Sequence, residues 1–175
     1  MLLNNGGAVI GNILSQSDSQ RPKTYIGWDI SNGTSFTAAS NLSYALTALN
    51  TSRAWGDYSM TADSGCHILL GKGTTTPTAS DYKIEDFVDP STDLLYVSGS
   101  VLYPSTATTI YGLTQVFQNV SGSAIQVSEI GLCIKVGYDW QSSHAYLLTH
   151  SVLSSPVTLQ PGRTYSFTTT IDLNV

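Results

Sequence analysis

From about residue 66 onward, short apolar runs alternate with groups of turn residues. The runs at His67–Leu70, Leu95–Leu102 and Ile110–Val120 each have the length of a β-strand. Two further runs cover Ala124–Val136 and Tyr146–Leu153. Strands at such short intervals predict a mainly β protein, an antiparallel β-sandwich or jelly roll, rather than a fold that alternates strands and helices.

The C-terminal segment has the strictest alternation in the chain. From residue 164 to residue 173, one set of alternate positions holds Thr, Ser and Asp, and the other holds Tyr165, Phe167, Thr169, Ile171 and Leu173, which indicates a strand with one buried face. The preceding Gln160–Arg163 contains Pro161 and Gly162, the residues that a type II turn favours at its two central positions. The pattern predicts a hairpin here. Ser121 and Gly122 predict a second connection of hairpin type.

A carboxylate, Glu129, lies in the middle of a strongly patterned strand. Ile130, Leu132, Ile134 and Val136 fall on one face of the Ala124–Val136 segment, and Glu129 falls on the other. We therefore expect a core face and a nearly solvated face. A carboxylate in mid-strand is costly unless it is exposed or paired, so an exposed edge or a partner contact is favoured over a catalytic role.

The first third of the chain has a different composition. Residues 1–23 are rich in Gly, Asn, Ser and Gln, which predicts a flexible N-terminal arm, with the β-sandwich domain covering residues 24–175. Between Phe36 and Leu49 the apolar residues fall near helical spacing, so one short helix is a further expectation. The start of the chain does not have the pattern of a secretory signal, and we expect synthesis in the cytoplasm without export.

Hydroxyl groups supply most of the polarity of this protein. Charged residues make up 11% of the chain, against roughly 25% in an average domain, whereas the sequence contains 24 Ser and 21 Thr. With seven Lys and Arg and a net charge of −5, a nucleic-acid partner is not expected. No apolar run reaches the length of a membrane-spanning helix, so no membrane partner is expected either.

No residue pattern indicates a catalytic, cofactor or metal site. His67 and His150 fall in predicted strands, where half-exposed strand positions are favoured over a catalytic base, and the chain contains no Gly-x-Ser-x-Gly motif. The acidic segment 85–93 lacks the spacing of a calcium loop. Cys66 and Cys133 permit one disulfide, although two buried thiols are favoured.

Exposed aromatic rings raise a second possibility, which is a module that binds cell-surface carbohydrate. Trp55, Tyr58 and Trp140 are the candidates for stacking on sugar rings. A glycoside hydrolase would also need paired carboxylates, and most Asp and Glu residues stand beside turns.

Three segments together resemble structural proteins of tailed bacteriophages. The first, GKGTTTPTASDYKIEDFV at 71–88, matches a strand that ends in G-x-G-T, a Thr/Pro loop and Asp-Tyr-x-Ile. The second, at 108–135, matches a Thr-rich strand, an Asn-x-Ser-Gly turn and a strand with I/V-x-E-I/V-G-L. The third, at 146–171, resembles the C-terminal strands of these proteins, with His150 at a position that more often holds Arg or Asp.

The resemblance implies a non-enzymatic virion protein without cofactors. Its implied partners are copies of itself in a symmetric oligomer and other virion proteins, on the capsid as a decoration protein or at the neck or tail. A carbohydrate- or receptor-binding β-sandwich module of a tail appendage, with a host-surface glycan as its ligand, is the alternative.

Overall fold

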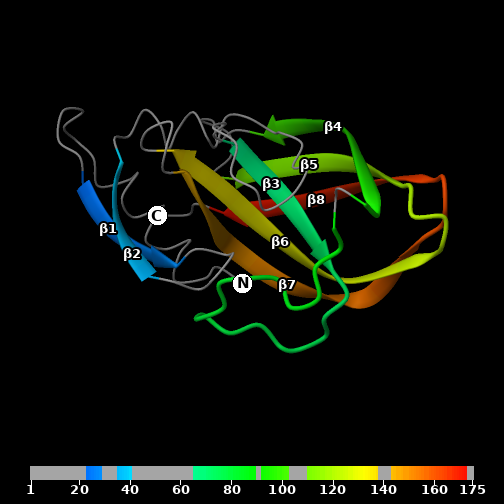
Figure 1. The fold of residues 1–175 in the computed structure, drawn as a ribbon, viewed down its shortest axis with the longest axis horizontal. Coiled ribbons are helices and arrows are strands. Elements are labelled where there is room, and N and C mark those ends of the chain that lie inside the picture. The colour runs from blue at the N-terminus through cyan, green and yellow to red at the C-terminus, as the bar shows by residue number, and fades with distance from the viewer. Residues whose placement is uncertain are drawn as a thin grey trace.

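The computed structural model describes residues 23–28, 35–40, 65–89, 92–102, 110–137 and 143–172 (Figure 1). This part of the chain contains strands and no helix. The strands are β1 (Lys23–Trp28), β2 (Ser35–Ser40), β3 (Gly65–Gly71), β4 (Leu94–Leu102), β5 (Ile110–Asn119), β6 (Ile125–Gly137), β7 (Ser143–Leu159) and β8 (Thr164–Asp172).

Two antiparallel sheets of three strands form a sandwich-like fold, as the strand pattern predicted. The strand orders are β3-β6-β7 and β4-β5-β8, and β1 pairs with β2 in a separate ladder. The β3-β6-β7 sheet lies toward the viewer in Figure 1, and the β4-β5-β8 sheet lies behind it. The expected strands at 67–70, 95–102, 110–120, 124–136 and 146–153 are all present.

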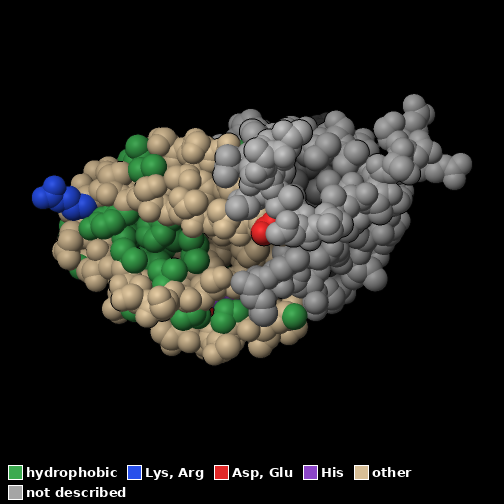
Figure 2. Space-filling model, turned by 180° about the vertical axis from the view of Figure 1, so that it is seen from behind, with side chains coloured by type: hydrophobic (Ala, Val, Ile, Leu, Met, Phe, Trp, Pro, Cys, Tyr) green, Lys and Arg blue, Asp and Glu red, His purple; other side chains and the backbone are tan. Residues whose placement is uncertain are grey.

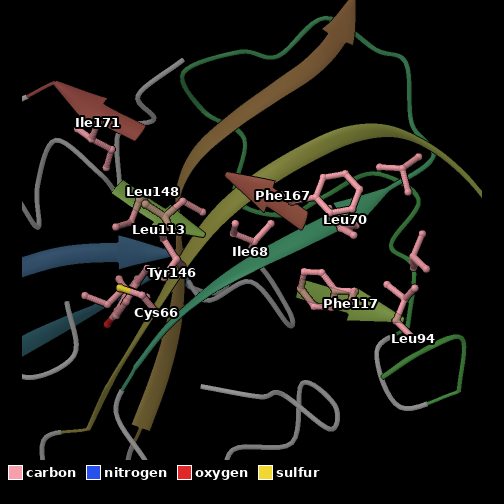
Figure 3. Close-up of a cluster of buried hydrophobic side chains, with 14 of the residues drawn as sticks. Cys66, Ile68, Leu70, Leu94, Leu113, Phe117, Tyr146, Leu148, Phe167 and Ile171 are labelled. Atoms are coloured by element: carbon pink, nitrogen blue, oxygen red, sulfur yellow. The ribbon is translucent and has the colours of Figure 1, made fainter. Parts of the chain in front are cut away.

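The core lies between the two sheets. Ile68, Leu132 and Leu148 come from one sheet, and Leu113 and Phe117 come from the other (Figure 3). All five side chains are at most 4% exposed, which is the burial that drives the two sheets together. The Phe117 ring packs edge-on to its neighbours, with ring centroids 6.2 Å from Tyr96 and 6.3 Å from Phe167.

A buried glutamine joins the two layers. The Gln115 side chain is 1% exposed and extends from β5 to the backbone of β3. Its Oε1 accepts a hydrogen bond from the Ile68 amide at 2.6 Å, and its Nε2 donates to the Cys66 carbonyl at 3.4 Å. A buried amide with both ends bonded fixes the offset of one sheet on the other, because any slip would leave these groups without partners.

Neither expected hairpin pairs its own two strands. The turn at Gln160–Arg163 is confirmed, since Gly162 has φ of 72° and the Arg163 amide donates to the Gln160 carbonyl at 3.2 Å. However, β7 pairs with β6 and β8 pairs with β5, so this turn carries the chain from one sheet to the other. The connection around Gly122 does the same between β5 and β6. Turn residues specify a reversal of chain direction, whereas packing of the core determines which strands pair with each other.

Asn119 forms hydrogen bonds to both connections that lead from one sheet to the other. Its Nδ2 donates to the carbonyls of Ser123 at 2.7 Å and Leu159 at 2.8 Å, and its Oδ1 accepts from the Ser121 amide at 3.0 Å. Its backbone also bonds to Gly162 and Arg163. The side chain is fully buried, so this one residue fixes the end of the sandwich where the chain changes sheets.

The predicted short helix is wrong for residues 36–40. These residues form β2 in register with β1, with Phe36 opposite Gly27 and Ala39 opposite Thr24. A short apolar stretch satisfies helical and strand spacing alike, and pairing with β1 selected the extended form. Residues 41–49 lie outside the described residues, as do residues 1–22 of the predicted arm, and Lys23 begins β1.

The two cysteines are buried thiols on opposite faces of one sheet. Cys66 belongs to the core between the sheets, and Cys133 belongs to a second cluster on the outer face of β3-β6-β7. Burial raises the pKa of the Cys66 thiol to about 12, against a smaller opposing effect of a hydrogen bond with Tyr111. The structure thus contains two buried thiols in separate clusters rather than one disulfide.

Candidate functional site

A long loop covers the outer face of the β3-β6-β7 sheet. After β3 the chain turns back at Lys72, whose amide donates to the Asp86 carbonyl at 2.8 Å, and it returns to β3 through the Val88 amide and the Leu70 carbonyl. The loop contributes Ile84, which is 2% exposed, to the outer cluster. The other members are Leu69, Cys133, Ala145 and Leu147, with Phe87 packed against them. We call residues 72–88 the covering loop.

This loop corrects the expectation of a solvated face on β6. Glu129 is 1% exposed and Cys133 is fully buried, so β6 has core on both sides. His67 and His150, expected at half-exposed positions, are only 2% and 4% exposed. Alternation on a strand distinguishes two faces, but it does not show that a loop distant in sequence covers the second one.

Glu129 is the anchor of the covering loop. Its Oε1 accepts hydrogen bonds from the amides of Gly73 at 3.1 Å and Asp86 at 3.0 Å. Its Oε2 accepts from the Glu85 amide at 3.4 Å and lies 2.7 Å from His150 Nε2. Three backbone donors and an imidazole satisfy the carboxylate in place of water, which is the condition for burying such a group.

His150 lies between two carboxylates. Its Nε2 contacts Glu129 Oε2, and its Nδ1 lies 2.9 Å from Asp81 Oδ2 on the covering loop. Each ring nitrogen is therefore within hydrogen-bond distance of one carboxylate oxygen. The Asp81–His150–Glu129 cluster thus links the loop, β7 and β6 through one ring.

A β-bulge places His150 in this cluster. Leu147 faces the outer cluster, so strict alternation along β7 would turn residue 150 toward the inner core. The register shifts here, with Cys133 opposite Leu147 and Leu132 opposite Thr149, which leaves Leu148 as an extra residue. The shift turns His150 to the outer face, opposite Gly131.

Asp81 is held by its own loop as well as by the imidazole. Thr78 donates to it twice, from the backbone amide at 3.0 Å and from Oγ1 at 2.6 Å. Burial acts to raise the pKa of this carboxyl, but the Thr78 bonds and then the contact with His150 outweigh it and bring the pKa below its ordinary value of 3.8. Asp81 is therefore ionised at neutral pH.

Gly71 and Gly73 leave the space that the Glu129 carboxylate occupies. A Cβ on Gly71 would overlap the Glu129 and Ile84 side chains, and one on Gly73 would lie 2.6 Å from Glu85 Oε2 and 2.8 Å from Glu129 Oε1. The two glycines of the G-x-G pattern thus allow the loop backbone to lie close to a buried carboxylate. It is not the phosphate loop that its position after a strand superficially suggests.

The chemistry of the cluster favours attachment over catalysis. A general base needs a lone pair directed at a nucleophile, and each nitrogen of His150 already contacts a carboxylate oxygen. An open hollow of about 360 Å³ adjoins the cluster, lined by Thr75, Ser80, Asp81, Tyr82, Lys83, Glu85 and His150. Among the described residues, no group of three or more His, Cys, Asp or Glu side chains could hold a metal ion.

The other candidate residues have separate outcomes. Glu85 and Asp86 are exposed at the surface of the covering loop, and Glu85 accepts from Thr75 Oγ1 at 2.8 Å. Trp55, Tyr58 and Trp140, the candidates for stacking on sugars, lie outside the described residues.

In the described ranges, no helix has the length and hydropathy needed to cross a membrane.

Sequence reasoning noticed the anomaly of Glu129 but not its partners. Asp81, Glu129 and His150 lie in three separate segments, 71–88, 108–135 and 146–171, and no local pattern links them. The fold brings these positions into hydrogen-bond contact. Comparisons of the chain with models of known families, with curated proteins and with solved structures give no match.

Proposed function

We propose that this chain is a non-enzymatic bacteriophage virion protein that assembles as a symmetric oligomer on the capsid or at the neck or tail. The observation that carries the proposal is the convergence of the three resembling segments. Gly71, Gly73, Asp81 and Glu129 come from the first two of these segments, and the two glycines lie against the buried Glu129 carboxylate. His150 of the third segment joins this carboxylate to the half-buried Asp81. Matched positions of the first two segments that meet in space favour a shared fold over chance similarity, whereas His150 is the position at which the third segment departs from the pattern.

The chemistry of that unit supports a structural role. It fastens a loop of 17 residues, 72–88, to the outside of a sheet, and its only imidazole is held on both sides by acidic groups. The low charge supports it as well, since 11% charged residues leave little repulsion between packed copies. Other virion proteins and copies of the same chain are the proposed partners, and the virion is the proposed location.

Protein analysis of purified particles tests this function. Particles from the phage whose genome encodes this chain are purified on a density gradient, and the chain is quantified by mass spectrometry. A copy number that is a fixed multiple of the capsomers indicates a decoration protein, whereas a few copies to about a dozen indicate the neck or tail. The absence of the chain from intact particles would contradict the proposal.

The predicted N-terminal arm provides a second test. If residues 1–23 order on a neighbouring subunit, deletion of residues 1–20 should reduce incorporation into particles, because contact area is lost. Normal incorporation of the shortened chain would exclude that role of the arm. The alternative function is a carbohydrate- or receptor-binding module of a tail appendage. A glycan array with the full chain tests it, since such a module should bind a defined sugar.

A further inference from the structure

The two sheets differ in what covers their outer faces. The covering loop packs on β3-β6-β7, whereas no described residue packs in the same way on the outer face of β4-β5-β8. The strand register places Leu95, Ser98, Thr114, Val116, Ser166 and Thr168 on this outer face, and the exposed Val97 is the extra residue of the bulge in β4 next to Ser98. We call this surface the open face.

The exposed apolar side chains gather on the open face at one end. Among the described residues, the exposed large hydrophobic side chains are Leu95 at 52%, Val97 at 51% and Val120 at 49%. Leu95 and Val97 lie on β4, and Val120 follows β5 directly. Figure 2 shows the molecule from behind, where hydrophobic side chains form one larger and several smaller patches among uncharged polar side chains and backbone.

Charge is confined to the ends of the open face. The three strands β4, β5 and β8 contain no charged residue before Asp172, the last residue of β8. Arg163 lies in the turn before β8, at the opposite end, and both residues are exposed. In Figure 2, blue is limited to one tip and red to the border of the described region. The half-buried Asp93 lies just before β4, at the Arg163 end.

We propose that the open face is a docking surface for a second copy of this chain, with the two β8 strands stacked in opposite directions. The inference rests on the proposed function, which requires self-assembly, and it identifies the surface. In a chain of net charge −5, two copies approach most easily through the face that carries no charge along its strands. Burial of Leu95, Val97 and Val120 then removes exposed apolar area from both copies.

The charges at the two ends select the orientation. Apolar burial is non-directional and depends mainly on the area removed from water, so it does not distinguish the two ways of stacking the face on itself. With β8 reversed over the β8 of the second copy, Arg163 of each copy meets Asp172 of the other. The alternative two-fold arrangement places β8 over β4 and brings Arg163 toward the half-buried Asp93.

The size of the face sets the strength of the contact. Three strands spaced by about 4.8 Å, with nine residues rising about 3.3 Å each, give roughly 400 Å² per copy. The pair would bury about 800 Å² in total, below the roughly 1,200 Å² of a stable complex. We therefore expect a reversible dimer that is populated at high concentration, as on the surface of a particle.

Sedimentation of the full chain over a wide concentration range tests the surface. The wild-type chain should form a dimer at the upper concentrations. Ser166→Lys, on the β8 strand of the open face, should weaken dimerisation at least about tenfold, because each copy brings a new charge into the contact. Ser155→Lys, an exposed serine on β7 of the other sheet, is the matched control and should dimerise like the wild type.

Charge reversal tests the orientation. Arg163→Glu alone should weaken the dimer by about tenfold at low salt, and the double variant Arg163→Glu/Asp172→Arg should restore it. Restoration by Asp93→Arg instead would overturn the reversed orientation. Circular dichroism of each variant confirms that the fold is intact.

The outcomes separate this inference from the proposed function. A chain that stays monomeric at every concentration, or equal effects of Ser166→Lys and Ser155→Lys, would overturn the open face as a self-docking surface. If that chain were still present in purified particles, the proposed function would stand without this surface. Dimers that require the open face, with no chain in the particles, would support the surface and contradict the virion role.

Discussion

His150 Nε2 and Glu129 Oε2 lie 2.7 Å apart in a site where Glu129 is 1% exposed. The pair joins β7 to β6, and it also determines how the covering loop is held, because the same carboxylate accepts the amides of Gly73, Glu85 and Asp86. A buried ion pair is not by itself a large source of stability, but removal of one partner leaves the other without compensation. The following predictions use that asymmetry.

Glu129→Gln should destabilise the protein by about 3 kcal/mol, because the amide nitrogen cannot accept the hydrogen bonds that converge on the carboxylate, so buried donors lose their acceptor. The measurement is chemical denaturation at pH 7. Asp86→Asn, an exposed acid on the same loop, is the matched control and should change stability by less than about 0.5 kcal/mol. Equal effects of the two substitutions would contradict the role of Glu129 as the anchor.

His150→Ala should release the covering loop while the sandwich stays folded. Loss of the imidazole removes the link to Asp81 and leaves the Glu129 carboxylate with its backbone donors alone. Hydrogen exchange at the amides of Gly73, Glu85 and Asp86 should accelerate by at least about tenfold, which corresponds to about 1.4 kcal/mol in the opening equilibrium.

Two readouts control this experiment. Amides in the ladder between β5 and β8 belong to the other sheet and should keep their protection. His150→Arg should restore slow exchange in the loop, because a guanidinium donates to two carboxylates and remains charged. Unchanged loop protection in His150→Ala would show that apolar contacts of Ile84 and Phe87 hold the loop without the cluster.

Asp81→Asn should remove part of the acid sensitivity of folding. The pKa of Asp81 is lower in the folded protein than its ordinary value of 3.8, so ionised Asp81 stabilises the fold above that value. This contribution is lost as the pH falls from about 5 through 3.8 to the lower folded pKa. Thermal unfolding from pH 7 to pH 2 measures it, and the difference in stability between wild type and Asp81→Asn should shrink on acidification. A difference that is constant with pH would contradict the assignment.

Cys66 should resist alkylation in the native protein at pH 8. Its pKa of about 12 leaves almost no thiolate at that pH, and the side chain is fully buried in the core. In a Cys133→Ala variant, which retains Cys66 as the single thiol of the chain, iodoacetamide should label the protein only after denaturant is added. Rapid labelling of the folded variant would show that the core between the sheets opens locally.

The raised pKa of Cys66 has a consequence for alkaline stability. A thiol whose folded pKa lies above its ordinary value of 9.0 stabilises the fold below pH 9, and this contribution is lost as the pH rises from 9 toward 12. Stability measured between pH 8 and pH 11 should therefore fall less steeply in Cys66→Ala than in the wild type. A parallel decline in both proteins would assign the alkaline loss to other groups.

Local sequence patterns determined the strands and one turn of this protein. Alternation from Thr164 to Asp172 predicted the exposed Thr and Ser positions of β8, and Pro161 and Gly162 predicted the turn before it. These features depend on residues within a few positions of one another, since backbone preference and the period of a strand are local properties. The mainly β class follows from the same local information.

Only the tertiary structure decided the partners. The tertiary structure selected the exchange of sheets at both turns, the cover that the loop gives to β6, and the contact of Asp81 with His150, two residues 69 positions apart. The bulge at Leu148 decides the last of these, because one extra residue in β7 reverses the face on which His150 lies. A strand pattern specifies which residues share a face, but the free energy of packing the whole chain selects what covers that face.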